Sequence, residues 1–272
     1  MATSTGKGGL RGLRGAPDWA LLLVAGLVYV FLYAPILVLM FFSFNSTRST
    51  QVWTGFSLEW YGELLRDESV HDAFRTSLTV GIAATAIATV IGTLTALALS
   101  RHSFRGQTFA DTAIYAATVM PEIVVGVSLL VFFVAIQFAL GVTTIIIAHV
   151  AFTISFVTIV VRARLSGMDR SIEEAAQDLG ASPVQTFLRV TLPMILPGVM
   201  AGALLAFTLS FDDFVITFFV SGVGSSTLPL KIYSMIKFGV SPVINALSTV
   251  VLVATMLLIF GGGRIFMRKE DA

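Results

Sequence analysis

SIEEAAQDLGASPVQTFLRVTLP, residues 171–193, is a polar stretch that lies between two long apolar runs at about 143–161 and 195–220. A helix that crosses a bilayer needs about 20 consecutive, mostly apolar residues. Four further windows meet this requirement, and they lie at about 19–43, 77–99, 112–136 and 244–266. The sequence therefore predicts an all-α membrane protein with six transmembrane helices, in which the polar stretch joins the fourth helix to the fifth.

The composition supports a membrane protein and excludes several other classes. Of the 272 residues, 56% are hydrophobic and only 12% are charged, whereas a soluble domain carries about 25% charged residues. A net charge of +1 argues against a nucleic-acid partner. The chain has no cysteine and its three histidines are scattered (His71, His102 and His149), so we expect no disulfide, no metal site, and histidines in ordinary packing or surface roles.

Lysine and arginine are unevenly distributed among the predicted loops. If the six helices alternate in direction, twelve of the 17 basic residues lie on the side that holds both termini and the polar stretch. Cytoplasmic loops carry the excess of basic residues, so that side is expected to be cytoplasmic. The first apolar run exceeds the 7–15 residues or so of a signal-peptide core, which favours an uncleaved first helix. The expected organisation is a cytoplasmic tail (1–18), a six-helix domain (19–266) with one cytoplasmic loop (169–193), and a cytoplasmic tail (267–272).

Three connections between the windows carry further expectations. Only a few residues around Gly141 join the third and fourth windows, which predicts a tight antiparallel pair. In the first external loop Ser57 could cap a helix whose apolar residues share one face, namely Leu58, Tyr61 and Leu65. In the second external loop Thr227 could cap a helix that ends before Gly239. Both helices are expected along the outer surface, where they serve either interfacial packing or the docking of an external partner.

The polar stretch itself predicts two short helices with a break. Ser171 could cap the first helix, with Glu174 three residues on as the other half of a capping box. Gly180 occupies the place of a left-handed residue after a helix end. Ser182 and Pro183 are typical of a cap and a first helical residue. On helix chemistry alone, such a hairpin either packs on its own membrane domain or offers a surface to a partner.

The same stretch carries a spaced motif. Glu174-Ala175-Ala176 is followed after three residues by Gly180, and nine residues later by Val190-Thr191-Leu192-Pro193. The pattern resembles the EAA loop of bacterial ABC-importer permeases, from which it departs only by valine in place of isoleucine at Val190. The resemblance implies that this helix seats in a groove of an ATP-binding subunit and moves when the ATPase dimer closes. The residues it assigns to ATPase coupling are Glu173, Glu174, Ala175, Ala176, Asp178, Leu179 and Gly180.

The chain shows no nucleotide site of its own. Gly6-Lys7-Gly8-Gly9 lacks the first glycine and the Ser/Thr of a phosphate-binding loop, and no strand precedes it. We therefore expect no enzyme activity and no cofactor in this chain, with ATP and Mg on the partner ATPase.

Three acidic residues fall within or beside apolar windows: Glu122, Asp212 and Asp213. Carboxylates inside a membrane usually face a cavity, a partner or a transport pathway. The two neighbouring aspartates point about 100° apart on a helix, so one could face the lumen and the other a neighbouring helix. Aromatic rings beside them, from Phe207, Phe211 and Phe214, attract organic cations. One alternative is that these acids pair with arginine or hydrogen-bond backbone at subunit contacts, and the other is a cation pathway. No basic residue is evident within the windows, which favours the pathway.

A second resemblance covers nearly the whole chain. Residues 210–216 (SFDDFVI), 219–222 (FVSG) and 227–234 (TLPLKIYS) look like the corresponding stretches of spermidine/putrescine ABC permeases, of the second permease type. The resemblance implies import by alternating access across the bacterial inner membrane. It also implies several partners: a homologous permease, an ATP-binding subunit dimer, an external substrate-binding protein, the polyamine and the lipid bilayer.

Other functions remain open at this point. The same importer class could carry another solute, such as an amino acid or ferric ion. A stand-alone secondary transporter would be expected to show internal repeats, and the sequence shows none. An intramembrane enzyme would need a convergent set of catalytic groups, for which His149 with Asp212 is a poor candidate. Gly198-x-x-x-Gly202 permits close helix packing, within the chain or against the partner permease.

Overall fold

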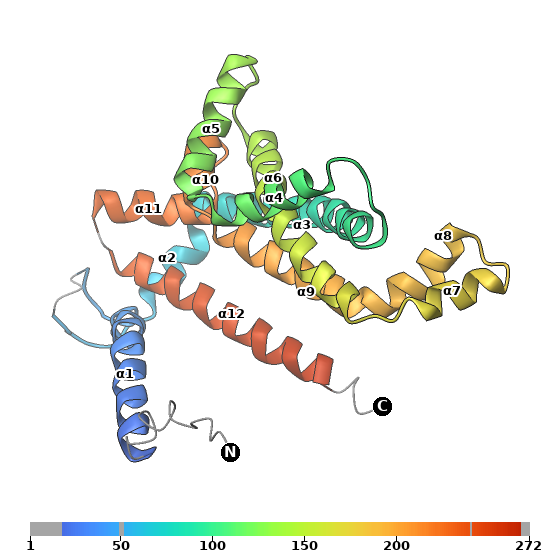
Figure 1. Ribbon diagram of the computed structural model, residues 1–272. Coiled ribbons are helices and arrows are strands. Elements are labelled where there is room, and N and C mark those ends of the chain that lie inside the picture. The colour runs from blue at the N-terminus through green and yellow to red at the C-terminus, as the bar shows by residue number, and fades with distance from the viewer. Residues whose placement is uncertain (1–17, 49–51, 240, 268–272) are drawn as a thin grey trace, which may run out of the picture. The chain divides into compact units, whose positions relative to one another are not determined.

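The computed structural model describes residues 18–48, 52–239 and 241–267 (Figure 1). The expected terminal tails, apart from residues 18 and 267, lie outside the described residues. Those described residues form helices and no strand, with one isolated bridge between Asn45 and Phe56. The chain divides into two units, one comprising residues up to Arg66 and from Phe238 onward, the other comprising Asp67–Lys237.

The first unit contains α1 (Asp18–Phe42), α2 (Glu59–Arg66) and α12 (Pro242–Met267). In the apolar segment Leu21–Phe42 of α1, the most hydrophobic window buries no residue. A helix that is apolar on every side and unburied suits a hydrocarbon environment rather than water.

The buried face of α2 differs from the predicted one. Leu58 and Leu65 are exposed, whereas Trp60 and Leu64 are buried, and α12 packs on α2. The indole Nε1 of Trp60 donates to the backbone carbonyl of Asn45 at 2.5 Å, and this bond fixes which side of the helix turns inward. The capping prediction is confirmed, because the hydroxyl of Ser57 accepts from the first helical amide at 3.1 Å.

The second unit is built around three long helices that pack on one another: α3 (Glu68–Arg101), α6 (Val142–Ser166) and α9 (Leu192–Asp212). Their shared core consists of Ala88, Ala96, Val157, Val161, Leu165, Ile195, Val199 and Ala206. Small residues allow close approach, since a Cβ on Gly92 would lie 2.8 Å from Val157 Cβ. A Cβ on Gly198 would lie 2.7 Å from Arg164 Cβ, so the Gly198-x-x-x-Gly202 face packs on α6 of the same chain.

The third predicted window is sharply broken. It forms α4 (Gln107–Val119) and α5 (Glu122–Ala135), which meet at an angle of 110°. Pro121 causes the break, because it has no N–H to donate and it forces Met120 into an extended conformation.

The predicted pairing of this window with the fourth window is correct only for α4, which packs on α6. After the break, α5 packs chiefly on α10 (Val215–Val220) and only slightly on α6. Gly126 of α5 lies against Phe219, where a Cβ would be 2.8 Å from the ring. A second core therefore joins α3, α5, α6 and α10, through Val80, Phe133, Ile145, Ala148, Phe152, Ile216 and Val220.

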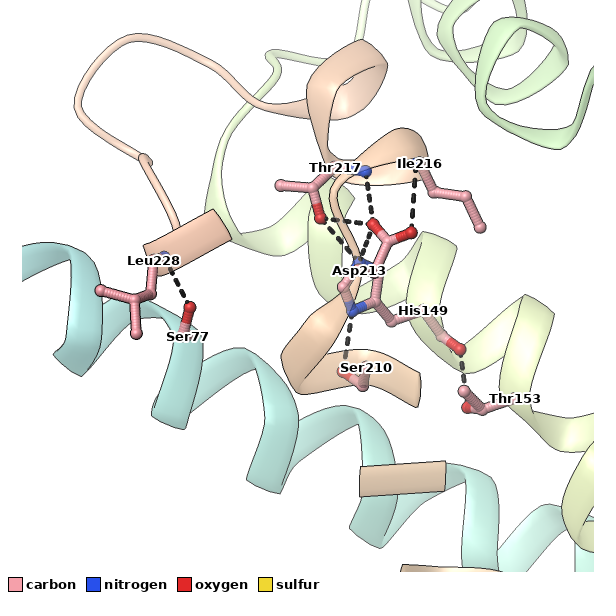
Figure 2. A network of polar contacts seen from close by, with 8 residues as sticks. All are labelled: Ser77, His149, Thr153, Ser210, Asp213, Ile216, Thr217 and Leu228. Atoms are coloured by element: carbon pink, nitrogen blue, oxygen red, sulfur yellow. Dashed lines mark hydrogen bonds and ion pairs between the residues drawn. The ribbon is translucent and has the colours of Figure 1, made fainter. Parts of the chain in front are cut away.

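The second external helix is present as α11 (Leu228–Phe238), and Gly239 follows it at φ +126°. The predicted cap is wrong, because the Thr227 hydroxyl makes no hydrogen bond. Ser77 of α3 supplies the acceptor instead, and its Oγ lies 2.8 Å from the Leu228 amide (Figure 2).

Four helical segments of the described chain are long and apolar enough to cross a membrane, or five if the bent pair α4–α5 counts as one span. They are Leu21–Phe42, Glu68–Arg101, Val142–Ser166 and Pro183–Asp212. The described part of α12 adds a shorter apolar helix, Pro242–Leu257. The fold is therefore that of a multi-pass helical membrane protein.

Candidate functional site

The first candidate site is the hairpin of α7 (Ser171–Asp178) and α8 (Pro183–Thr186), which lies at one end of α9 (Figure 1). The predicted capping box is wrong, because Ser171 is the first helical residue and its amide is accepted by the carboxylate of Asp169 at 2.9 Å. This backbone hydrogen bond lowers the pKa of Asp169 below its ordinary value. Glu174 is therefore released from capping and is exposed.

The break between the two helices follows the prediction. Gly180 adopts φ +89°, and the amides of Gly180 and Ala181 bond back to the carbonyls of Gln177 and Ala176, the pattern of a Schellman motif. Ser182 and Gln185 then form a reciprocal capping box at the start of α8. Both ends of the turn are thus specified by local chemistry.

The second helix is not a separate element. It continues through a π-helical turn, η1 (Phe187–Thr191), into α9. Pro193 cannot donate to the carbonyl four residues earlier, and a wider turn relieves the clash of its ring with that carbonyl. The hairpin is therefore directly continuous with the long helix that ends at Asp212.

Most of the residues assigned to coupling are accessible. Five of them are exposed, namely Glu174, Ala175, Asp178, Leu179 and Gly180. Leu179 is 90% exposed. A shallow groove of about 380 Å³ runs between α7 and the α8–η1 segment, lined on its two sides by residues that include Ala176, Leu179, Gln185 and Arg189. An exposed, small-residue helix beside a groove is suited to close contact with another protein.

Glu173 differs from its neighbours in this set. Its side chain is only 14% exposed, and it forms an ion pair with Arg101 at 3.0 Å. Its other carboxylate oxygen accepts from the Thr191 hydroxyl at 2.7 Å. Nothing in the sequence pairs Glu173 with Arg101, because the two residues lie 72 positions apart on different helices.

The second candidate site is the acid cluster at the break between α9 and α10. As expected from their angular spacing, the two aspartates diverge: Asp212 is exposed and Asp213 is buried. Glu122, the first residue of α5, is also exposed and lies within electrostatic range of Asp213 and Asp212. The fold thus brings together three carboxylates from two broken helices.

Asp213 is held by four hydrogen bonds (Figure 2). Its carboxylate accepts from the Thr217 amide at 2.8 Å and hydroxyl at 2.7 Å, and from the Ile216 amide at 3.2 Å. The fourth donor is Nε2 of His149, at 3.2 Å, and the other ring nitrogen of His149 lies 2.7 Å from Ser210 Oγ. Asp213 therefore caps the half-helix α10 and joins it to α6.

The expectation that no basic residue lies within the apolar windows is wrong, because His149 lies within the fourth window. The side chain is 1% exposed and sits on α6, one turn before Thr153, whose hydroxyl donates to its carbonyl at 2.6 Å. A titratable residue in an apolar span was the available signal. Nothing in the linear sequence paired it with an aspartate 64 positions away.

Aromatic rings line the neighbourhood of the acids. Phe211 stacks on Phe207 with ring centres 5.6 Å apart, and Phe214 lies 4.7 Å from the ring of Tyr233 on α11. Phe211 and Phe214 are partly exposed, and Tyr233 is 45% exposed. Sequence reasoning found the phenylalanines but not Tyr233, which only the packing of α11 brings alongside.

Comparisons with known proteins agree with these features. Residues 88–266 match the family described as "Binding-protein-dependent transport system inner membrane component". The chain is 46% identical to the putrescine transport system permease protein PotI of Escherichia coli K12, with 89% of each chain covered. It is 43% identical to the spermidine/putrescine transport system permease protein PotC of the same organism, covering 89% of this chain and 92% of that one.

Solved structures show the same fold at lower identity. A chain of a bacterial ABC transporter involved in alginate import superposes with a TM-score of 0.75 at 15% identity, covering 92% of this chain and 96% of that one. A chain of the MetNI methionine ABC transporter gives 0.60 at 20% identity, with 77% and 97% covered.

The fold is a bundle of apolar helices that extends into an exposed, capped hairpin, and the matching family makes the class a membrane component of a transport system. The chain belongs to the family of binding-protein-dependent transport system inner membrane components. It is a multi-pass inner-membrane protein, and its resemblance to polyamine permeases is confirmed by the relatives.

Proposed function

We propose that this chain is one of two permease subunits in an ATP-driven importer of polyamines, spermidine or putrescine. It forms half of the translocation pore with a homologous permease and receives substrate from an external binding protein. It transmits motion from a dimer of ATP-binding subunits, on which ATP and Mg reside. The named functions of PotI and PotC support this proposal.

We further propose six spans with both termini in the cytoplasm. The bent pair α4–α5 counts as one span and α12 as the sixth, within a permease domain at 19–266 that has cytoplasmic tails at 1–18 and 267–272. The coupling loop at 169–193 then lies in the cytoplasm, which places twelve of the 17 basic residues on that side.

The observation that carries the substrate assignment is the acid cluster beside aromatic rings. Glu122 and Asp212 are exposed at helix breaks, where unpaired backbone carbonyls favour a wet cavity. Carboxylates and the faces of Phe211 and Phe214 both attract ammonium groups. Asp213 is buried behind the residues that line the pathway, where it holds the break between α9 and α10, and its charge remains close to the pathway.

Uptake by the assembled transporter tests this assignment. The complex is reconstituted in liposomes with ATP inside and the binding protein outside, and labelled spermidine and putrescine are compared with an amino acid and ferric ion. Asp212→Asn is expected to lower polyamine uptake without disturbing assembly, whereas the control Asp72→Asn, at an exposed carboxylate on α3, leaves it unchanged. Normal uptake by Asp212→Asn refutes the pathway, and transport by this chain alone without ATP refutes the importer mechanism.

The coupling role has a matched pair of glycines. Gly180 lies at φ +89° with open space around its Cβ position, so Gly180→Ala adds only backbone strain, about 1–2 kcal/mol. Gly167, before α7, has φ −89° and only an ordinary 3.8 Å contact, so Gly167→Ala adds none. We expect Gly180→Ala to reduce ATP-driven uptake several-fold and Gly167→Ala to leave uptake unchanged. Equal effects of the two substitutions on uptake would refute the coupling role of the α7–α8 hairpin.

A further inference from the structure

The helix α7 is fastened to the rest of the second unit by side chains as well as by its two connections. The ion pair between Arg101 and Glu173 spans 3.0 Å, and the two side chains are only 12% and 14% exposed. Beside it, the guanidinium of Arg170 donates to the carbonyl of Ser100 at 2.5 Å. Both contacts end on the last turn of α3.

The same glutamate also reaches a third element. Its second oxygen accepts from the hydroxyl of Thr191 at 2.7 Å, and Thr191 is buried at the end of η1, directly before α9. One carboxylate therefore joins α7, α3 and α9. A buried carboxylate is costly when a partner is removed, so this cluster resists opening more than a surface pair would.

The covalent connections of α7 do not fix it in the same way. Gly167 lies before the helix and Gly180 directly after it. Glycine permits a wide range of backbone angles, so the connection through Gly167 leaves α7 free to move relative to α6, whereas the hydrogen-bonded turn at Gly180 joins α7 to α8. The side-chain cluster removes that freedom.

The helix that receives the contact is the longest in the second unit. From Ser77 to Arg101 the helix covers about 36 Å, at a rise of about 1.5 Å for each of the 24 steps between them. Nine residues after the start of α3, Ser77 accepts from the first amide of α11 at 2.8 Å (Figure 2). Along its length α3 packs on α6 and α9, so a displacement of its last turn is transmitted through the core.

We infer that Arg101, Glu173 and Thr191 form a clamp that makes α7 move as one body with α3 and α9. Glu173 is thus a positioning residue that faces the permease's own helices, whereas the exposed Glu174 faces the ATPase. This inference rests on the proposed function, in which α7 is the coupling helix.

The structural part is tested by distances between spin labels in the assembled transporter. The chain contains no cysteine, so labels are placed at Gln177→Cys on α7 and Val90→Cys on α3, both at exposed positions. With an intact clamp the distance between the labels is expected to stay the same with ATP or ADP bound. In Glu173→Gln the distribution is expected to broaden and to shift between nucleotides. A nucleotide-dependent distance in the intact protein, or an unchanged one in Glu173→Gln, overturns the clamp.

The functional part compares Glu173→Gln with Glu174→Gln. We expect Glu173→Gln to retain the ATP-binding subunits on co-purification but to lower uptake per ATP hydrolysed at least about fivefold, the lower end of usual coupling energies. Glu174→Gln is expected to weaken retention of the ATP-binding subunits instead. Loss of retention in Glu173→Gln would make it a contact residue and overturn the inference.

Two further variants guard against simple misfolding. Thr191→Val removes one hydrogen bond and leaves the ion pair, and is expected to lower the coupling ratio less than Glu173→Gln does. The exchange Arg101→Glu with Glu173→Arg is expected to recover uptake that either single change loses, and no recovery counts against the clamp. If the intact complex imports no polyamine under ATP, the proposed substrate fails, while the label distances still decide on the clamp.

Discussion

Replacement by asparagine is expected to destabilise the protein at Asp213 but not at the neighbouring Asp212. Asp213 accepts four hydrogen bonds, three at one carboxylate oxygen and one at the other. In Asp213→Asn one oxygen remains as an acceptor, but the NH2 group that replaces the other oxygen faces a hydrogen-bond donor. One charge-assisted hydrogen bond of about 1.5–3 kcal/mol is therefore lost. Asp213→Leu leaves the two backbone amides of Ile216 and Thr217 unsatisfied and costs about 2–6 kcal/mol. Asp212 is exposed, and no hydrogen bond or ion pair of its side chain is found in the described part of the chain.

Thermal unfolding of the purified chain in detergent measures the difference. At about 2–4 °C per kcal/mol, Asp213→Asn is expected to lower the midpoint by about 3–12 °C and Asp213→Leu by more. Asp212→Asn is expected to stay within about 2 °C, as for surface substitutions of about 0.5 kcal/mol or less. Equal shifts for the two asparagine variants, or none for Asp213→Asn, would refute the reading of Asp213 as the cap that holds the break.

Two further outcomes can be measured in the same way. Gly198→Ala places a Cβ 2.7 Å from the Cβ of Arg164 and is expected to lower the stability by about 1–3 kcal/mol. Gly202→Ala, with its nearest contact at 3.4 Å, should leave the stability nearly unchanged. The reverse order would contradict the packing of α9 on α6. Asp67 caps α3 by accepting from the amides of Ser69 and Val70; burial raises its pKa, but these hydrogen bonds outweigh it and hold the pKa below 3.8. Because that pKa is depressed, the stabilisation by the carboxylate is present above about pH 4 and is lost as the pH falls through the lower pKa of the folded state. Asp67→Asn should therefore flatten the pH dependence of the unfolding midpoint in this range. Asp67→Ala is expected to cost about 0.5–2 kcal/mol at neutral pH.

Local chemistry was sufficient for much of the fold. The apolar windows located the long helices, Gly180 predicted the left-handed turn, and Ser182 with Pro183 predicted the start of α8. Each of these depends on residues within a few positions of one another. Where several local solutions compete, the same reasoning failed, as at Ser171, where the carboxylate of Asp169 captured the amide.

Side-chain pairs between different helices could not be predicted from the sequence. Glu173 with Arg101, and Asp213 with His149, join residues on different helices, and nothing in their spacing indicates that the faces meet. The buried side of α2 was likewise decided by one distant hydrogen bond, from Trp60 to Asn45.

The sequence by itself determined that the chain crosses a membrane, where its long apolar segments lie, and which hairpin carries the family motif, because hydrophobic run length and turn chemistry act locally. Only the tertiary structure decided which acids are exposed and which is buried as a cap. It also decided that Glu173 faces inward while Glu174 faces outward. The physical reason is that a charge is stabilised by whatever donors surround it in space, and in this bundle those donors come from helices far apart along the chain.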